Sequence, residues 1–214
     1  MPPLQKKSKL KTGKLSKVDC QEIRVRCGKF DKELDSKSNL GDTEMVLGSW
    51  LLYRDLLRRE VKEIEMPYFV CPQISQNIAD QPVIVEVREH ATQILRGYWR
   101  WRGLVGVPIF AEGHWTLLVL RRSGPKDSEV VKVKYYDSLE LGKLKDGSEA
   151  CKKAAKSIME ALSLKMELPG RCDRSFQEDG CNCGLYVLQY WEGHLRQFLG
   201  EGWSIDRPSG KSTT

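Results

Sequence analysis

The sequence has no long hydrophobic run. Nowhere does it reach the roughly 18 to 20 consecutive apolar residues that a membrane helix needs. The lysine-rich start is not followed by the apolar segment of a secretory signal. We therefore expect a soluble, monomeric protein without a membrane partner, located inside the cell in the nucleus or cytoplasm.

Regularly paired cysteines are also lacking. The seven cysteines are odd in number and irregular in spacing, which is a poor framework for disulfides and fits a reducing compartment. An alternative is a zinc site formed by Cys172, Cys181, Cys183 and His194, but these spacings differ from the paired knuckles typical of structural zinc. We expect free thiols, no metal and no cofactor.

The net charge of +6 is concentrated in an N-terminal segment rich in lysine. Residues 1–40 have few large apolar side chains, so burial cannot offset the entropy lost on ordering, and we predict a disordered arm. Such a basic run indicates either a nuclear-import signal or contact with nucleic acid, and a merely solvated terminus is about as common. We expect one domain over residues 41–202 and a flexible tail over 203–214.

Helical periodicity occurs at four places in this domain. The first predicted helix starts at the N-cap Asp42-Thr43, and the second ends near Gly97; the third covers 149–164, and the last follows Cys183. The apolar stripe of the first helix is Val46, Leu47, Trp50, Leu51 and Leu57, and that of the second is Val87, Ala91, Ile94, Leu95 and Tyr98. The third has Cys151, Ala154, Ala155, Ile158, Met159 and Leu162, and the last has Val187, Tyr190, Trp191, His194, Leu195 and Phe198. The segment from Pro67 to Pro82 predicts a short strand and loop.

Extended segments lie between these helices. The runs LVGVPIF and HWTLLVL, separated by Ala111-Glu112-Gly113, predict a pair of strands. In the next run Val131, Val133, Tyr135 and Asp137 share one face, so Asp137 closes an apolar strand face.

Cys183 stands at the first turn of the closing helix. A helix N-terminus carries about half a positive charge and unpaired N–H groups, which favour a thiolate over a thiol. Gly184 lets a substrate backbone come close, the peptide N–H of residue 183 faces a developing oxyanion, and Gln177 can bring a side-chain amide to it. This pattern is typical of a nucleophilic cysteine.

A catalytic thiolate needs a proton donor, and the chain has only three histidines, at positions 90, 114 and 194. His90 lies in a charged helical segment, and His194 is about three turns along the helix from Cys183, too far to touch it. His114 starts a strand after a glycine. Asp137 ends the neighbouring run, where its carboxylate can accept the other imidazole N–H.

The motifs His114-Trp115, Tyr136-Asp137-Ser138, and Gln177 six residues before Cys183-Gly184 resemble those of the ubiquitin-like-specific (SUMO/sentrin) proteases and their adenoviral protease relatives. The resemblance covers roughly residues 45 to 200. It departs from the family pattern at Asn182, where an acidic residue is usual, and at Trp50-Leu51, which only partly matches an early family motif.

The resemblance implies an α+β, papain-like cysteine protease fold with a central mixed sheet flanked by helices. It implies a peptidase or isopeptidase whose catalytic residues are His114, Asp137, Cys183 and Gln177, acting on ubiquitin-like modifiers that end in Gly-Gly and on their conjugates. Trp115 and Gly184 would contact substrate, with Trp115 as a wall of a tunnel that admits only glycine-sized residues. We expect no nucleic-acid partner except through the basic arm.

Each of these residues also has a simpler interpretation. Cys183 can be a small buried helix residue, Trp115 a core residue and Asp137 a turn residue. Cys181, two residues before Cys183, is a rival candidate for the nucleophile. Two other functions keep the same motifs: an acetyltransferase that uses coenzyme A, and an inactive modifier-binding or transposon-associated module.

Overall fold

The computed structural model describes residues 40–57, 67–79, 84–123, 130–139, 145–164 and 182–200. The predicted arm, apart from its last residue, and the predicted tail lie outside these ranges, as does most of the predicted segment around Gln177. The elements in chain order are α2 (Asp42–Leu57), β1 (Tyr68–Phe69), α3 (Pro72–Ala79), α4 (Val85–Trp101), β2 (Leu104–Ala111), β3 (His114–Ser123), β4 (Val130–Asp137), α5 (Lys145–Ala161) and α6 (Cys183–Phe198).

The strands form one mixed sheet in the order β1-β2-β3-β4, in which β1 runs parallel to β2 and the other pairs are antiparallel. The predicted strand pair is confirmed. Its turn, Glu112-Gly113, has φ values of 49° and 74°, and positive φ at both central residues suits a tight hairpin and explains the glycine. The α+β architecture with a mixed sheet and flanking helices is also confirmed.

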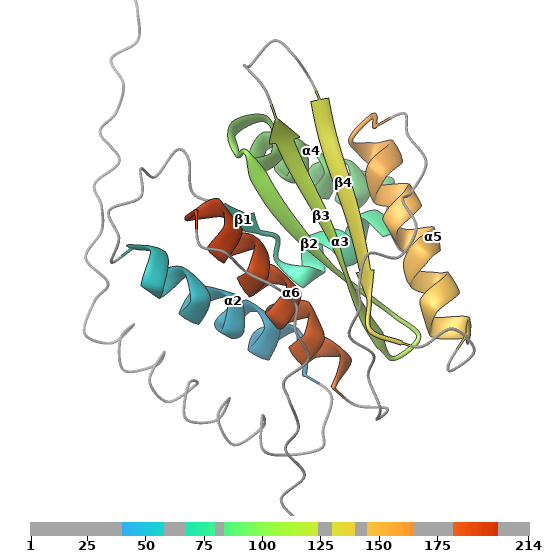
Figure 1. The fold of residues 1–214 in the computed structure, drawn as a ribbon. Helices are drawn as coiled ribbons and strands as arrows, with labels where there is room; N and C mark the ends of the chain where they lie inside the picture. The colour runs from blue at the N-terminus through green and yellow to red at the C-terminus, as the bar shows by residue number, and fades with distance from the viewer. Residues whose placement is uncertain are drawn as a thin grey trace, which may run out of the picture.

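Helices cover both faces of the sheet (Figure 1). On one face α2 and α6 pack on alternate residues of β3, which include Trp115, Leu117 and Val119. On the other, α3, α4 and α5 pack on Leu118 and Leu120. The period of two in β3 therefore divides the apolar core into two layers, one on each side of the sheet.

The first helix begins one residue before the predicted start: Gly41, not Asp42, is the N-cap, because its carbonyl oxygen accepts the first helical hydrogen bond, from Met45 at 3.0 Å. Glu44 reaches back to accept a hydrogen bond from the N–H of Gly41 at 3.1 Å, one half of a capping box. The predicted stripe needs correction at Val46, which is 41% exposed, because Met45 faces the core with Leu47 instead.

The segment from Pro67 onward contains a helix that the sequence analysis did not predict. Residues 68–69 are the expected short strand, but Pro72 opens the helix α3. Proline is well suited to the first turn of a helix, because the N–H that it lacks would have no partner there. The three prolines of this segment favoured a loop in the prediction, but Pro72 stands at the start of a helix.

The remaining helices agree with the predicted periods except at Val87, which lies in the first turn of α4 and is 39% exposed. Helix α5 covers Lys145–Ala161 instead of the predicted 149–164, and Ser163 follows it with a positive φ of 59°. The end of α4 also differs. Helix α4 runs through Gly97 and ends at Trp101, because a glycine within a helix costs only about 1 kcal/mol and the buried Trp99 continues the packing. In α5 and α6 the predicted stripes are buried or half-buried. In the described part of the chain, no helix combines the length and apolar character needed to cross a membrane.

Candidate active site

The ends of two antiparallel strands bring His114 and Asp137 together. His114 is the first residue of β3 and Asp137 the last residue of β4. In the register of this pair, Asp137 lies opposite Thr116, two residues from His114. Residues two apart on a strand, such as His114 and Thr116, point to the same face of the sheet, and so do directly opposite residues on neighbouring strands. The side chains of His114 and Asp137 therefore project from the same end and the same face of the sheet.

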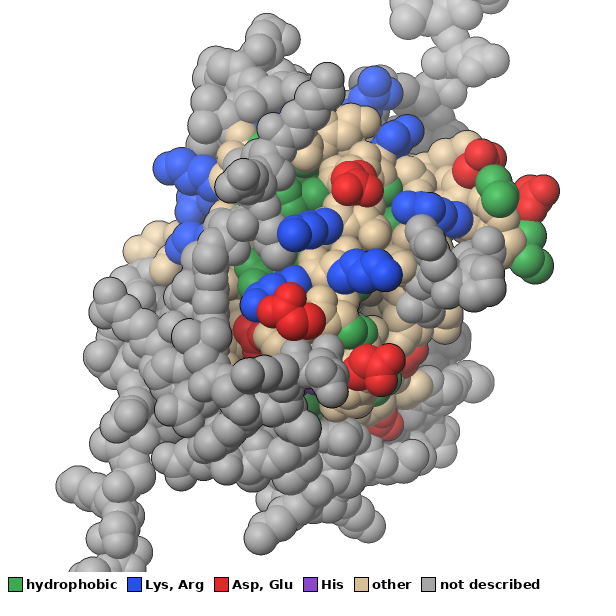
Figure 2. Space-filling model, turned by 90° about the vertical axis from the view of Figure 1, so that its right-hand side faces the viewer, with side chains coloured by type: hydrophobic (Ala, Val, Ile, Leu, Met, Phe, Trp, Pro, Cys, Tyr) green, Lys and Arg blue, Asp and Glu red, His purple; other side chains and the backbone are tan. Residues whose placement is uncertain are grey.

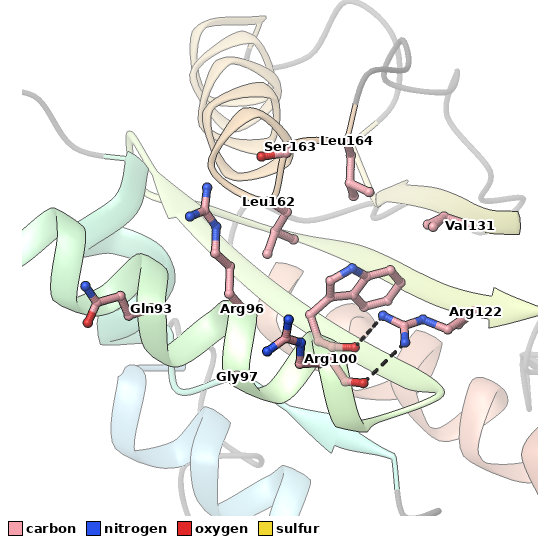
Figure 3. Close-up of a pocket in the computed structure, with 10 residues that line it drawn as sticks. Gln93, Arg96, Gly97, Arg100, Arg122, Val131, Leu162, Ser163 and Leu164 are labelled. Carbon is pink, nitrogen blue, oxygen red and sulfur yellow. Dashed lines mark hydrogen bonds between the residues drawn. The ribbon is translucent and has the colours of Figure 1, made fainter. Parts of the chain in front are cut away.

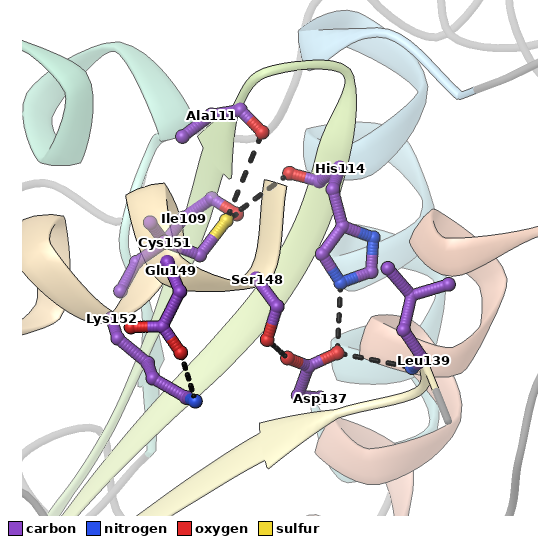
Figure 4. A network of polar contacts seen from close by, with 9 residues as sticks. All are labelled: Ile109, Ala111, His114, Asp137, Leu139, Ser148, Glu149, Cys151 and Lys152. Atoms are coloured by element: carbon purple, nitrogen blue, oxygen red, sulfur yellow. Dashed lines mark hydrogen bonds and ion pairs between the residues drawn. The ribbon is translucent and has the colours of Figure 1, made fainter. Parts of the chain in front are cut away.

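His114 and Asp137 form a buried hydrogen-bonded pair. Nε2 of the imidazole lies 2.8 Å from Oδ1 of the carboxylate, and the two residues are only 3% and 2% exposed. Oδ1 also accepts the backbone N–H of Leu139 at 3.0 Å, and Oδ2 accepts the hydroxyl of Ser148 (Figure 4). These donors fix the carboxylate, and the carboxylate fixes the imidazole ring.

The pair shifts the pKa values of both groups. Burial acts to lower the pKa of His114, but hydrogen bonds to Asp137 and to Cys183, and the charges of both, outweigh it and raise this pKa to about 9. Burial acts to raise the pKa of Asp137, and the hydrogen bonds from His114, Ser148 and Leu139 lower it below its usual value. Near neutral pH this is an imidazolium paired with a carboxylate.

Cys183 comes to this pair from the opposite layer of the molecule. It is the first residue of α6 and is 1% exposed. Because Nε2 of His114 is bonded to Asp137, Nδ1 is the nitrogen left for the thiol. The first N–H groups of a helix have no acceptor within it, so the N–H of Cys183 is a donor next to the sulfur. A cysteine sulfur, an imidazole and a carboxylate in this order can support nucleophilic catalysis.

A second thiol, Cys151 of α5, lies behind the imidazole and has a different environment. Its sulfur contacts the carbonyl oxygens of His114 at 3.4 Å and Ala111 at 3.9 Å. Burial raises its pKa to about 12, so it stays a neutral thiol. It supports the start of β3 and has no imidazole to activate it.

Gly147 is packed tightly against the same strand start. A Cβ at this position would lie 3.0 Å from Cβ of His114 and 3.4 Å from the carbonyl oxygen of Glu112. The absent side chain lets the first turn of α5 come close enough for Ser148 to reach Asp137. Neither Gly147 nor Ser148 was among the predicted site residues. The only local signal was a glycine followed by serine at a helix start.

The other histidines lie apart from this centre. His194 is buried on α6 and hydrogen-bonds the Tyr136 hydroxyl at 2.9 Å through Nε2. Burial, with the positive charges of Lys134 and Arg121, lowers its pKa to about 4. His90 is exposed on α4. The structure thus brings together the histidine and aspartate that the sequence singled out.

Trp115 and Gly184, which we expected at the substrate, both pack on Leu40. The indole N–H of Trp115 donates to the Leu40 carbonyl oxygen at 2.9 Å, and the side chain is 1% exposed. A Cβ on Gly184 would lie 3.0 Å from Cβ of Leu40 and 3.2 Å from Cε of Met45. These contacts hold the start of α6 next to β3. A role in substrate binding stays a prediction for both residues.

Gln177, Cys172 and Cys181 lie outside the described residues, so the predicted oxyanion donor and the rival nucleophile remain predictions. Within the described ranges, no three side chains of His, Cys, Asp or Glu are grouped as metal ligands.

No family model matches the sequence, and no curated protein is similar to it. Solved structures are similar. The Xanthomonas campestris effector XopD, solved bound to ubiquitin, matches with 25% identity and a TM-score of 0.59, over 77% of this chain and 79% of its own. A de-sumoylating protease matches with 12% identity and a TM-score of 0.55, over 79% and 68%.

The Ulp1 protease domain, solved with Smt3, the yeast ortholog of SUMO, matches with 15% identity and a TM-score of 0.51, over 92% of this chain and 90% of its own. The likenesses below 25% identity concern the fold alone, and it is the same fold in each case. XopD adds similarity in sequence to similarity in fold. We conclude that this chain has the fold of the Ulp1 protease domain and is similar to XopD in both fold and sequence.

Proposed function

We propose that this protein cleaves the peptide or isopeptide bond after the C-terminal Gly-Gly of a ubiquitin-like modifier, SUMO or a related one. The observation that carries the proposal is the buried His114–Asp137 pair with the Cys183 thiol beside it at the start of a helix. The substrate class is supported by XopD, solved with ubiquitin, and by Ulp1, solved with Smt3.

In the proposed first step the Cys183 thiolate attacks the carbonyl carbon of the last glycine. The negative charge moves to the carbonyl oxygen, where the N–H of Cys183 and the predicted Gln177 amide would stabilise it. The tetrahedral species collapses with loss of the amine, which takes a proton from the His114 imidazolium. The products of this step are a free amine, a neutral imidazole and a thioester between Cys183 and the modifier.

In the second step a water molecule attacks the thioester carbonyl while neutral His114 removes one of its protons. The C–S bond then breaks, which releases the modifier as a carboxylic acid and restores the thiolate and the imidazolium. Asp137 holds the ring so that Nδ1 faces the sulfur and stabilises the positive charge in the resting state. No step needs a metal or cofactor.

The proposed specificity depends on glycine at the cleavage site. Trp115 follows His114 directly, and its position on Leu40 is set by the 2.9 Å hydrogen bond of its indole. Trp115 and Cys183 belong to the same apolar cluster, between the sheet and α2 and α6, so a bulky ring on this side would leave room only for a chain without side chains. Substrates with alanine as the last residue of the modifier should therefore be cut far more slowly than those with glycine.

The direct test uses ubiquitin and SUMO-type modifiers that carry a C-terminal electrophile. We expect one of them to form a covalent adduct of one modifier per chain, detected by mass, which Cys183→Ala abolishes. Cys71→Ala is the matched control, because Cys71 is a half-buried free thiol outside the site and its loss should leave labelling intact. No adduct with any modifier, or an adduct that survives Cys183→Ala, would contradict the proposal.

The same chain should be incubated with acetyl-coenzyme A. None of the structural relatives named above is described as an acetyltransferase. We therefore expect no acetyl group on Cys183, and its appearance without any modifier adduct would favour acyl transfer over proteolysis.

A further inference from the structure

A concavity of about 810 Å³ opens between the C-terminal half of α4, the residues just after α5, the end of β3 and the start of β4. Its size lies in the range of small-molecule sites, roughly 300 to 1,000 Å³. Arg122, which lines it, is eight residues along β3 from His114. At about 3.3 Å per residue this is roughly 26 Å, so the concavity is separate from the thiol centre.

Three arginines, Arg96, Arg100 and Arg122, line this concavity, and none of the described residues that line it is acidic (Figure 3). Within the described ranges, none of the three forms an ion pair with a carboxylate. Arg96 and Arg100 are also four residues apart on α4, where like charges repel each other. A cluster of unneutralised positive charge in a hollow attracts anions and is stabilised by binding one.

Two of the guanidinium groups are held in place before any ligand binds. Arg122 donates to the carbonyl oxygens of Trp99 at 3.0 Å and Arg100 at 3.2 Å, and it lies 4.9 Å from the centroid of the Trp99 ring. Arg96 donates through Nε to the carbonyl oxygen of Ala161 at 2.7 Å, at the end of α5. Fixed donors lose little conformational entropy on binding, which increases affinity.

The basic side chains among the described lining residues are all arginines, and this favours a particular class of anion. Its planar fork binds phosphate and carboxylate through two parallel hydrogen bonds, whereas lysine acts as a point charge. Arg96 donates a hydrogen bond to the protein through Nε, so its two terminal nitrogens are left to bind an anion. The geometry of these donors suits a phosphate group.

The opposite wall of the concavity is apolar. It consists of Val131 of β4 with Leu162 and Leu164 just after α5, which lie across from the α4 arginines in Figure 3. The Trp99 ring is 8% exposed and already lies against Arg122, so it is not an open platform for stacking a series of bases. A hollow with arginines on one side and aliphatic groups on the other fits a compact molecule better than an extended nucleic acid.

Lysines also lie on the outer side of α5. Lys153 and Lys156 are exposed there, as is Glu160, and the half-buried Lys152 is paired with Glu149. Figure 2 shows Lys and Arg side chains spread across this face, with Asp and Glu side chains among them. Basic side chains around the opening raise the local concentration of anions.

We propose that this concavity binds an organic phosphate, with the phosphate on Arg96, Arg100 and Arg122 and the organic part on the aliphatic wall. This site is independent of the peptidase activity. The proposal would stand or fall whether or not Cys183 cleaves a modifier.

The test is titration calorimetry of the full chain at about 150 mM salt with three probes: ATP, pyrophosphate and adenosine. We expect ATP to bind more tightly than pyrophosphate, because only ATP has a ring for the aliphatic wall, and adenosine not to bind. The double variant Arg96→Gln/Arg100→Gln should weaken ATP binding at least tenfold. Arg88→Gln/Arg121→Gln is the matched control, since it removes the same charge from positions outside the lining and should change affinity less than twofold.

Four results would overturn the proposal. They are no binding of ATP or pyrophosphate, equal losses in the two double variants, pyrophosphate binding as tightly as ATP, and tighter binding of an acidic peptide such as oligoglutamate than of ATP. The last would assign the concavity to a protein segment. Circular dichroism and modification of Cys183 by a small thiol reagent check that both double variants are folded.

Discussion

The molecule contains two buried histidines in opposite electrostatic surroundings. At the end of β3, the carboxylate of Asp137 and the Cys183 thiol face His114, and its pKa is raised to about 9. On α6, His194 faces a tyrosine hydroxyl and two nearby cations, and its pKa is lowered to about 4. Burial acts to lower both values, so the partner at hydrogen-bonding distance decides whether a buried imidazole carries a proton at neutral pH.

The largest expected effect is a loss of kcat/KM when the imidazole of His114 is removed. His114→Gln keeps an amide nitrogen near the position of Nε2 but cannot carry a proton to the leaving amine. We expect its kcat/KM on a modifier–fluorophore substrate to fall by about 10²- to 10⁴-fold, the usual contribution of general acid–base catalysis. Steady-state kinetics measure this.

His194→Gln is the matched control for that variant. His194 is neutral at pH 7, so a neutral amide replaces it without a change of charge. We expect kcat/KM per folded molecule to change less than threefold. Equal losses in the two variants would remove the distinction between the two histidines.

The carboxylate that makes His114 different can be neutralised by Asp137→Asn. We expect about a 10²-fold loss in kcat/KM together with a change in its pH profile. In the unmodified protein the imidazolium loses its proton near pH 9, so kcat/KM should fall above that pH. Without the charge of Asp137 the pKa of His114 decreases, because burial then dominates, and the alkaline limb should move to lower pH.

The pH profile is the decisive readout for Asp137→Asn. A merely structural role for Asp137 would reduce the rate at every pH and leave the alkaline limb in place. A titration of both histidines by NMR gives the same information directly, with His114 expected near 9 and His194 near 4.

A smaller effect is expected from Ser148, the hydroxyl behind Asp137. In Ser148→Ala the carboxylate loses one of its donors, which raises the pKa of Asp137 towards its usual value and loosens the ring of His114. We expect a three- to tenfold loss in kcat with KM little changed, and Ser148→Thr should recover most of it. Ser157→Ala, a half-buried serine on the same helix, should have no effect on kcat.

The smallest effect concerns the neutral histidine. Tyr136→Phe removes the hydroxyl that hydrogen-bonds His194 at 2.9 Å. We expect the free energy of unfolding in urea to fall by about 1 to 2 kcal/mol, since a buried hydrogen bond is lost and Nε2 is left without that partner. The kcat/KM should stay within twofold, and a tenfold loss would mean that His194 is coupled to the catalytic centre.

Features encoded in local sequence were predicted well. Continuous apolar runs predicted β2 and β3, alternation predicted β4, and helical periods predicted α2, α4, α5 and α6. His114 was singled out among three histidines by its place at the start of a strand, and Asp137 mainly by the resemblance to a known family. The helix α3 was missed, because its opening proline was interpreted as a breaker.

Features that depend on tertiary contacts were not predicted. Ser148 lies 11 residues from Asp137 and reaches it only because Gly147 packs on His114. The arginine concavity joins Arg96 of α4, Arg122 of β3 and Leu164 just after α5, which no local sequence pattern relates. The packing of Gly184 against Leu40 was also not predicted, since the sequence suggested that a substrate backbone comes close to Gly184.

One consequence follows from the two layers on either side of the sheet. Helix α6 brings Cys183 from one layer, and α5 brings Ser148 and Gly147 from the other, while His114 and Asp137 end the strands between them. A chain in which only one layer has docked therefore has a thiol without its acid, or an acid without its thiol. During refolding, recovery of the proposed hydrolysis should therefore coincide with the slower of the two docking events.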